Sequence, residues 1–165
     1  MDQINLTPMT LELARQFYRE FKLDPDLFED KAKYVPFSYS DEFSVNRVRR
    51  YAEMGRVFMA VMLGRKPIGE IVLKNIDVEQ KTCELGITMI NDTYKNRGYG
   101  TAAEKLILKY AFEEIGMQTV FADALIGNTR SQHVLEKVGF VRISEDEHFI
   151  YYRFDHPYDP NLLRI

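Results

Sequence analysis

Apolar residues recur along the chain with two different periods, which predict helices and strands in a mixed order. A spacing of three to four residues predicts helices after Thr10, from Ser44 to Met54, from about Thr101 and over 129–138. Runs typical of strands lie at residues 4–6, 57–63, 68–76, 81/82–90, 120–124, 140–145 and 147–154. Antiparallel strands come first and a strand–helix–strand unit follows. We therefore expect one α/β domain over residues 1–165, built on a mixed sheet.

The segment 94–101 says most about chemistry, because it joins an apolar strand to a strongly periodic helix through Gly98 and Gly100. A strand, a glycine-containing turn and a helix N-terminus present backbone N–H groups that suit a phosphate. A side chain at either glycine would hold the ligand away from those groups. Lys95 and Arg97 add positive charge at the same place. The pattern predicts a loop that binds a phosphorylated cofactor.

Two other interpretations of this loop stay open. Residues 98–103 fit the dinucleotide fingerprint G-x-G-x-x-G/A, and Asp123 is a candidate for its distant acidic residue. However, residues 91–97 separate the strand from the first glycine, and few residues follow for the remaining strands of such a domain. A G-x-G is also often a simple turn. The Walker A pattern is absent from the sequence.

A second motif lies further along, where Asn128-Thr129-Arg130-Ser131 leads into Leu135-Glu136-Lys137-Val138-Gly139-Phe140. With these residues the chain resembles the GNAT superfamily of acetyl-CoA-dependent N-acetyltransferases. Their first motif, Q/R-x-x-G-x-G/A, matches 95–100 with lysine in its first position. Their second, N-x-x-(S/A)-x-x-x-(Y/L)-E-x-x-G-F, matches 128–140. The resemblance extends over residues 4–154 and looks most like the branch of ribosomal-protein N-terminal and diamine acetyltransferases.

The resemblance implies a three-layer fold, with a mixed sheet of about seven strands flanked by about four helices. It also implies acetyl-CoA as the cofactor and acetyl transfer to a primary amine by direct attack in a ternary complex. The cofactor contacts that it implies are Ile87, Thr88, Met89, Lys95, Asn96, Arg97, Gly98, Tyr99, Gly100, Thr101, Asn128 and Ser131. Helix capping alone would also explain Thr101 and Asn128.

Acetyl transfer to an amine needs a base, and Glu84 is our first candidate because it opens the strand that the resemblance places beside the acetyl group. Glu70 on the preceding strand is the reserve candidate. Tyr151, or its neighbour Tyr152, is a candidate for a hydroxyl near the thiol. Many members carry a tyrosine acid where this chain has Leu135. A thiolate leaves tolerably without such help, since its reference pKa is near 8.5.

The segment 23–43 indicates the chemical class of the acetyl acceptor, because the resemblance places this segment at one wall of the acceptor cleft. Acidic and aromatic residues alternate there, and such a mixture suits a cationic amine. A peptide N-terminus, a polyamine or another small amine would fit. The same residues would equally serve as a solvated loop anchored to the core. A basic cluster at Arg47, Arg49 and Arg50 is either a solvated face or a site for an anionic partner. A catalytically silent acetyl-CoA-binding module is the alternative function.

Bulk properties narrow the class of protein further. The chain has 165 residues and a formal net charge of -3, which argues against nonspecific nucleic-acid binding. No apolar run approaches the ~20 residues of a membrane span, and we expect a cytoplasmic location. The lone Cys83 and the unclustered histidines predict no metal site and no internal disulfide. The apolar tail after Pro160 would dock on its own domain or on a second subunit, so a homodimer is considered.

Overall fold

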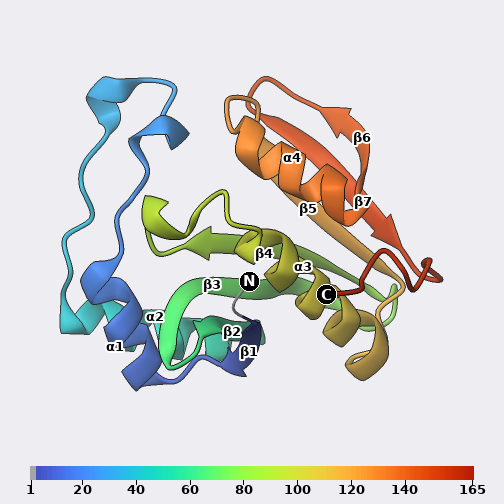
Figure 1. Ribbon diagram of the computed structural model, residues 1–165, viewed down its shortest axis with the longest axis horizontal. Helices are drawn as coiled ribbons and strands as arrows, with labels where there is room; N and C mark the ends of the chain where they lie inside the picture. The colour runs from blue at the N-terminus through green and yellow to red at the C-terminus, as the bar shows by residue number, and fades with distance from the viewer. Residues whose placement is uncertain (1–2) are drawn as a thin grey trace.

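The computed structural model describes residues 3–165 and is built on a seven-stranded mixed sheet with helices on both faces (Figure 1). The strands stand in the order β1-β2-β3-β4-β5-β7-β6. Their bounds are β1 Ile4–Pro8, β2 Val57–Leu63, β3 Lys66–Asp77, β4 Thr82–Met89, β5 Thr119–Leu125, β6 Val141–Glu145 and β7 Phe149–Asp155. The α-helices are α1 Leu11–Glu20, α2 Asp41–Glu53, α3 Tyr99–Lys109 and α4 Thr129–Val138. The predicted mixed α/β sheet is therefore confirmed.

One strand pair gives the fold its central feature. All neighbouring strands of the described sheet pair antiparallel except β4 and β5, which are parallel. Their pairing ends at Leu85 and Ala122, although β4 continues to Met89 and β5 to Leu125. The two strands therefore diverge and leave a gap in the sheet, with the antiparallel strands β1–β4 on one side and β5–β7 on the other (Figure 1). A dinucleotide-binding domain needs several adjacent parallel strands, so this described sheet does not support that interpretation.

Helices cover the sheet on either side of this gap. Helix α1 packs against β3 and α2 against β2, whereas α3 packs against β1, β3 and β4, and α4 against β5. Between α1 and α2, residues 21–40 form a long excursion that contains two short 3₁₀ turns, Pro25–Leu27 and Lys31–Lys33 (Figure 1). The lack of regular apolar spacing over 23–43 predicts a loop or short helix there, which is confirmed up to residue 40, whereas residues 41–43 already belong to α2.

Two predicted helix starts are corrected by capping geometry. Helix α2 begins at Asp41, because the Ser40 hydroxyl oxygen accepts a 3.1 Å hydrogen bond from the Phe43 N–H. Ser44, the predicted cap, is fully buried inside that helix. Helix α3 begins at Tyr99, two residues before the predicted start, because Gly98 turns the chain with φ of 79°.

The C-terminal tail docks on its own domain. Leu163 is buried, the Tyr158 hydroxyl donates to Glu113 at 3.0 Å, and Lys105 Nζ donates to the Arg164 carbonyl at 3.0 Å. Of the two predicted alternatives for the tail, docking on its own domain is thus the observed one. Association with a second subunit stays a separate prediction.

Candidate functional site

The phosphate loop, residues 95–101, presents backbone donors as the sequence predicts. Gly98 holds the left-handed conformation that ends the turn, and α3 starts directly after it with no side-chain cap among the described residues. The first N–H groups of a helix have no acceptor within it, so those of Tyr99, Gly100 and Thr101 face outward. A Cβ built on Gly100 meets no heavy atom within 4 Å. Space for an anion therefore lies directly before these donors.

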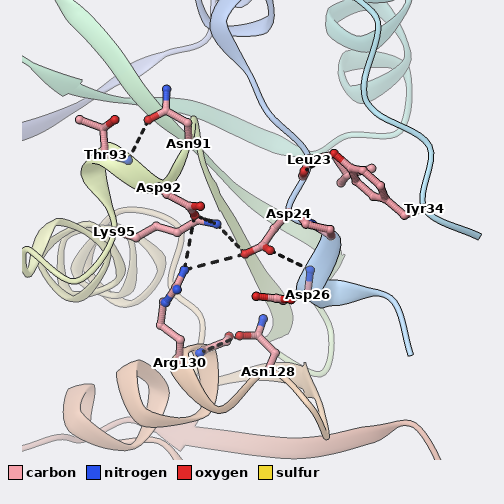
Figure 2. A network of polar contacts seen from close by, with 12 residues as sticks. Leu23, Asp24, Asp26, Tyr34, Asn91, Asp92, Thr93, Lys95, Asn128 and Arg130 are labelled. Carbon is pink, nitrogen blue, oxygen red and sulfur yellow. Dashed lines mark hydrogen bonds and ion pairs between the residues drawn. The ribbon is translucent and has the colours of Figure 1, made fainter. Parts of the chain in front are cut away.

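A polar network ties this loop to the excursion between α1 and α2 (Figure 2). Lys95 Nζ lies 2.7 Å from an oxygen of Asp24 and 2.8 Å from one of Asp92. Arg130 at the start of α4 approaches the same two carboxylates at 3.9 Å. The side chains of Lys95 and Asp24 are only 14% and 15% exposed, so little solvent screens their contact. Two positive side chains thus converge beside the phosphate loop.

The protonation of Asp24 follows from this network. Partial burial raises the pKa of Asp24, but bonds from Lys95 and from the Asp26 N–H outweigh that effect, and the net pKa lies below its usual value. Asp24 is therefore ionised at neutral pH. It competes for Lys95 with any anion that enters the loop.

A cleft of about 380 Å³ begins at this network and runs past Ile87–Met89 of β4, beyond the point where the pairing with β5 ends. Gly100 and Lys95 line one end, and Thr88 and Glu70 line the other. Side chains alternate along a strand, so Thr88 and its neighbours Ile87 and Met89 point to opposite faces, yet all line the cleft. The cleft therefore passes through the sheet where the strands diverge.

A cluster of three polar side chains stands at the inner end, with Tyr18 and Glu70 buried and Arg47 partly exposed. The Glu70 carboxylate accepts a short hydrogen bond from the Tyr18 hydroxyl and forms an ion pair with Arg47, whose Nη2 lies 2.7 Å away. Arg47 Nε also donates to the Tyr18 oxygen at 3.0 Å. Burial, reinforced by the Glu70 charge, raises the pKa of Tyr18, so the phenol keeps its proton. Phe21, Phe37 and Phe43 line the cleft around the cluster.

Arg47 is the member of the predicted basic cluster that reaches the cleft. Burial lowers the pKa of Arg47. Glu70 and the two adjacent tyrosines raise it by more than burial lowers it, so its net pKa lies above the usual value. The guanidinium stays charged and fixes the position of Glu70. Arg49 instead stands 4.0 Å from Glu53 along the exposed face of α2.

Most of the residues that the resemblance assigns to the cofactor lie around connected hollows. A second cavity of about 300 Å³ shares Met89, Lys95 and Gly100 with the cleft. The predicted residues that line at least one of the two are Ile87, Thr88, Met89, Lys95, Asn96, Gly98, Gly100, Thr101, Asn128 and Ser131. Arg97 is exposed outside both linings, and the Tyr99 side chain packs in the core. Asn128 caps α4, its side-chain oxygen accepting from the Ser131 N–H at 3.2 Å.

The structure places Glu84 and Tyr151 elsewhere. Both line a separate hollow with Asp123, outside the lining of the cleft. Glu84 lies 3.7 Å from Lys74. Glu84 precedes Thr88 on β4 by four residues, which corresponds to about 13 Å of strand. The Tyr151 hydroxyl donates to Asp146, and this bond raises the pKa of Tyr151. Their predicted catalytic roles remain predictions.

Two further side chains have clear structural roles. Leu135 is 2% exposed and packs in the core, so no proton donor stands at the position of the tyrosine acid that the resemblance describes. Cys83 is also buried, and burial with the nearby Glu84 charge raises the pKa of its thiol to about 12. A thiol of this kind is inert as a nucleophile at neutral pH.

Glu104 on α3 is a lining residue that sequence reasoning did not single out. It is 1% exposed, and its Oε2 has no hydrogen-bond partner among the described residues. Desolvation raises its pKa to about 8. The signal was available, since Glu104 follows Gly100 by four residues and stands in the apolar stripe of Ala103 and Ile107.

Burial of Glu104 predicts a pH-dependent stability. Its folded pKa lies above the unfolded value of 4.5, so the unfolded state loses this proton first as the pH rises. The free energy of unfolding should therefore fall between pH 4.5 and pH 8, by roughly 3 kcal/mol at pH 7. Glu104→Gln should remove this slope in urea titrations at several pH values. Glu79→Gln, an exposed position, is the control, and parallel slopes in all three proteins would contradict the burial argument.

Comparison with known proteins places the chain in a family. The family of acetyltransferase (GNAT) domains matches residues 3–141. The chain belongs to this family. The Bacillus subtilis protein named "Putative ribosomal N-acetyltransferase YdaF" is 30% identical over 93 residues, which cover 56% of this chain and 50% of that protein. The chain thus aligns with about half the length of this curated relative.

Solved structures of other GNAT proteins share the fold. A GNAT-family acetyltransferase from Bacillus anthracis superposes with a TM-score of 0.71 at 23% identity, covering 93% of this chain and 95% of that chain. A dodecameric spermidine N-acetyltransferase from Vibrio cholerae gives the same TM-score of 0.71 at 15% identity, covering 94% and 95%. At these identities the likeness establishes the GNAT fold.

Within residues 3–165, no helix is long and apolar enough to cross a bilayer. In the same range, no three His, Cys, Asp or Glu side chains form a group that could hold a metal ion.

Proposed function

We propose that this GNAT domain transfers an acetyl group from acetyl-CoA to a primary amine within the cleft. One observation supports the proposal most directly. A single cavity runs from Gly100, at the N-terminus of α3, through the gap in the sheet to Glu70. A pyrophosphate fits the outer end, where amides and Lys95 stand together. An extended pantetheine arm fits the gap, where strand edges are unpaired. Asn128 and Ser131 line this passage.

Acetyl-CoA would supply the activated acyl group, and the residues of the cleft would receive the proton of the amine. Nitrogen attacks the thioester carbonyl, the C–S bond breaks, and the thiolate leaves without an acid because its reference pKa is only about 8.5. We assign the proton acceptor to Glu70, directly or through one water, because Glu70 lines the cleft and Glu84 does not. Arg47 and Tyr18 hold that carboxylate in place.

The acceptor that fits best is a weakly basic amine. Glu70 already shares its charge with Arg47, so little net negative charge remains for a polycation. An α-amine, with a reference pKa near 7.7–8.0, needs less help from a base than a lysine-like amine near 10.4. The aromatic wall of Phe21, Phe37 and Phe43 would take an apolar side chain next to the amine. A peptide N-terminus meets these requirements, and a small monoamine is the second choice.

Turnover with a panel of amines tests the proposal. Thiol release from acetyl-CoA should rise with short peptides bearing a free N-terminus and should stay near background with N-blocked versions. A silent binding module remains the second candidate function, because a buried leucine replaces the tyrosine acid at position 135. That function would give acetyl-CoA binding with no thiol release across the whole panel.

The contact between Asp24 and Lys95 gives a prediction about affinity. Asp24→Asn should tighten acetyl-CoA binding about three- to tenfold, because Lys95 would lose the less exposed of its two carboxylate partners and keep only the solvent-screened contact with Asp92. Asp26→Asn on the same 3₁₀ turn is the matched control, since its side chain is 86% exposed and pairs with Lys31. Calorimetry would measure both affinities. Equal or weaker binding by Asp24→Asn would show that the network does not compete with the cofactor.

A further inference from the structure

Glu104 occupies a position that the proposed chemistry does not use. It stands on α3 one turn below Gly100, and it lines both the cleft and the adjoining hollow between β4 and β5. One helical turn spans about 6 Å over four residues. A chain that leaves the phosphate loop and enters the gap must therefore pass this side chain.

The hydrogen bonding of the Glu104 side chain is also incomplete. Its Oε2 is buried without a partner among residues 3–165, although Gly100, Ser131 and Ile87 line the same space. A buried polar group without a partner costs about 1–3 kcal/mol. An apolar residue at this stripe position of α3 would avoid that cost. A cost of this kind is expected where the group has a partner in the working state.

We propose that Glu104 is a cofactor-contacting residue that hydrogen-bonds the pantetheine arm of acetyl-CoA. The inference rests on the proposed function. One turn beyond the phosphate-binding end, an extended arm presents its hydroxyl and first amide, which both donate and accept hydrogen bonds. A carboxyl side chain can satisfy either group, and a protonated one can donate as well as accept.

The apolar wall around Glu104 explains why this contact would matter for specificity. Ile87, Val134 and Leu135 contribute hydrocarbon to the passage beside the polar Asn128 and Ser131, and an amide that enters it loses much of its water. A ligand amide left without a partner there would weaken binding. Glu104 therefore distinguishes an arm that carries amides from a simple acyl chain of the same length.

Two substitutions and two ligands test the inference by calorimetry. Glu104→Leu fills the space without a polar group, and Glu104→Gln keeps a donor and an acceptor. We expect Glu104→Leu to weaken coenzyme A binding about tenfold, the value of one buried hydrogen bond. Glu104→Gln should stay within about threefold of the parent. Adenosine 3′,5′-bisphosphate, which lacks the arm, should bind all three proteins equally.

Thermal unfolding without ligand separates a contact from a structural role. Removing an unpartnered buried carboxyl should raise the stability of Glu104→Leu while its affinity for coenzyme A falls. A structural role would lower stability and the affinity for both ligands together, and that result would overturn the inference. Tight, unchanged coenzyme A binding by Glu104→Leu would overturn it while leaving the proposed function intact. Failure of the parent protein to bind either ligand would instead overturn the proposed function, and the inference with it.

Discussion

Gly100→Val is expected to weaken acetyl-CoA binding about 100-fold, the largest effect we predict on affinity. The valine side chain would project into the cleft directly before the backbone donors of α3, and each lost charge-assisted hydrogen bond is worth about 1.5–3 kcal/mol. The fold should be preserved, because a Cβ at Gly100 meets no heavy atom within 4 Å. Calorimetry with acetyl-CoA and thermal unfolding measure the two effects separately.

Gly100 is a cleaner test than Gly98. Gly98 has a φ of 79°, so any side chain there would strain the turn and confuse loss of binding with loss of structure. Gly100→Ala is the graded control, with a smaller expected loss because its single methyl group blocks less of the cleft. Unchanged affinity in Gly100→Val would remove the phosphate loop from the cofactor site.

Glu70→Gln should lower turnover about 100-fold while the affinity for acetyl-CoA stays within about twofold. The lower end of general-base catalysis is a factor of about 100, and Glu70 lines the inner end of the cleft, away from the phosphate loop. The substitution also leaves Arg47 without its ion pair, so the rate must be corrected for the folded fraction of the protein.

Glu84→Gln is the matched variant for this measurement. Glu84 opposes Lys74 on the neighbouring strand and lines a different hollow, so its loss should leave turnover unchanged. If Glu84→Gln loses activity and Glu70→Gln keeps it, the base is Glu84, as the strand position first suggested. Loss in both variants would indicate that the two carboxylates act on the same proton path.

The local features of the fold and of the site could be predicted from the sequence. Helical spacing, strand periodicity and the glycines at 98 and 100 are properties of neighbouring residues, and they predicted the elements and the phosphate loop. Because side chains alternate along a strand, a strand over these residues also predicts Glu84 and Thr88 on the same face. Alternation could not show that the cleft opens at Thr88 and not at Glu84, because that depends on where β4 and β5 diverge.

Contacts between distant segments lay beyond sequence reasoning. Asp24 and Lys95 are separated by 71 residues, and nothing local marks them as partners. The sequence predicted Arg47 as part of a solvated face or of a site for an anionic partner, and only tertiary packing brings it to Glu70, 23 residues away. Glu104 is an intermediate case. Its place in an apolar stripe was visible, but its missing partner was not.

Titration of the purified protein with acetyl-CoA, with NAD and ATP run alongside, tests the central claim most directly. We expect saturable, micromolar binding of acetyl-CoA that Gly100→Val weakens about 100-fold, with much weaker binding of the two other nucleotides. Absence of acetyl-CoA binding, or equal binding of NAD, would contradict the assignment of the cleft to acetyl-CoA.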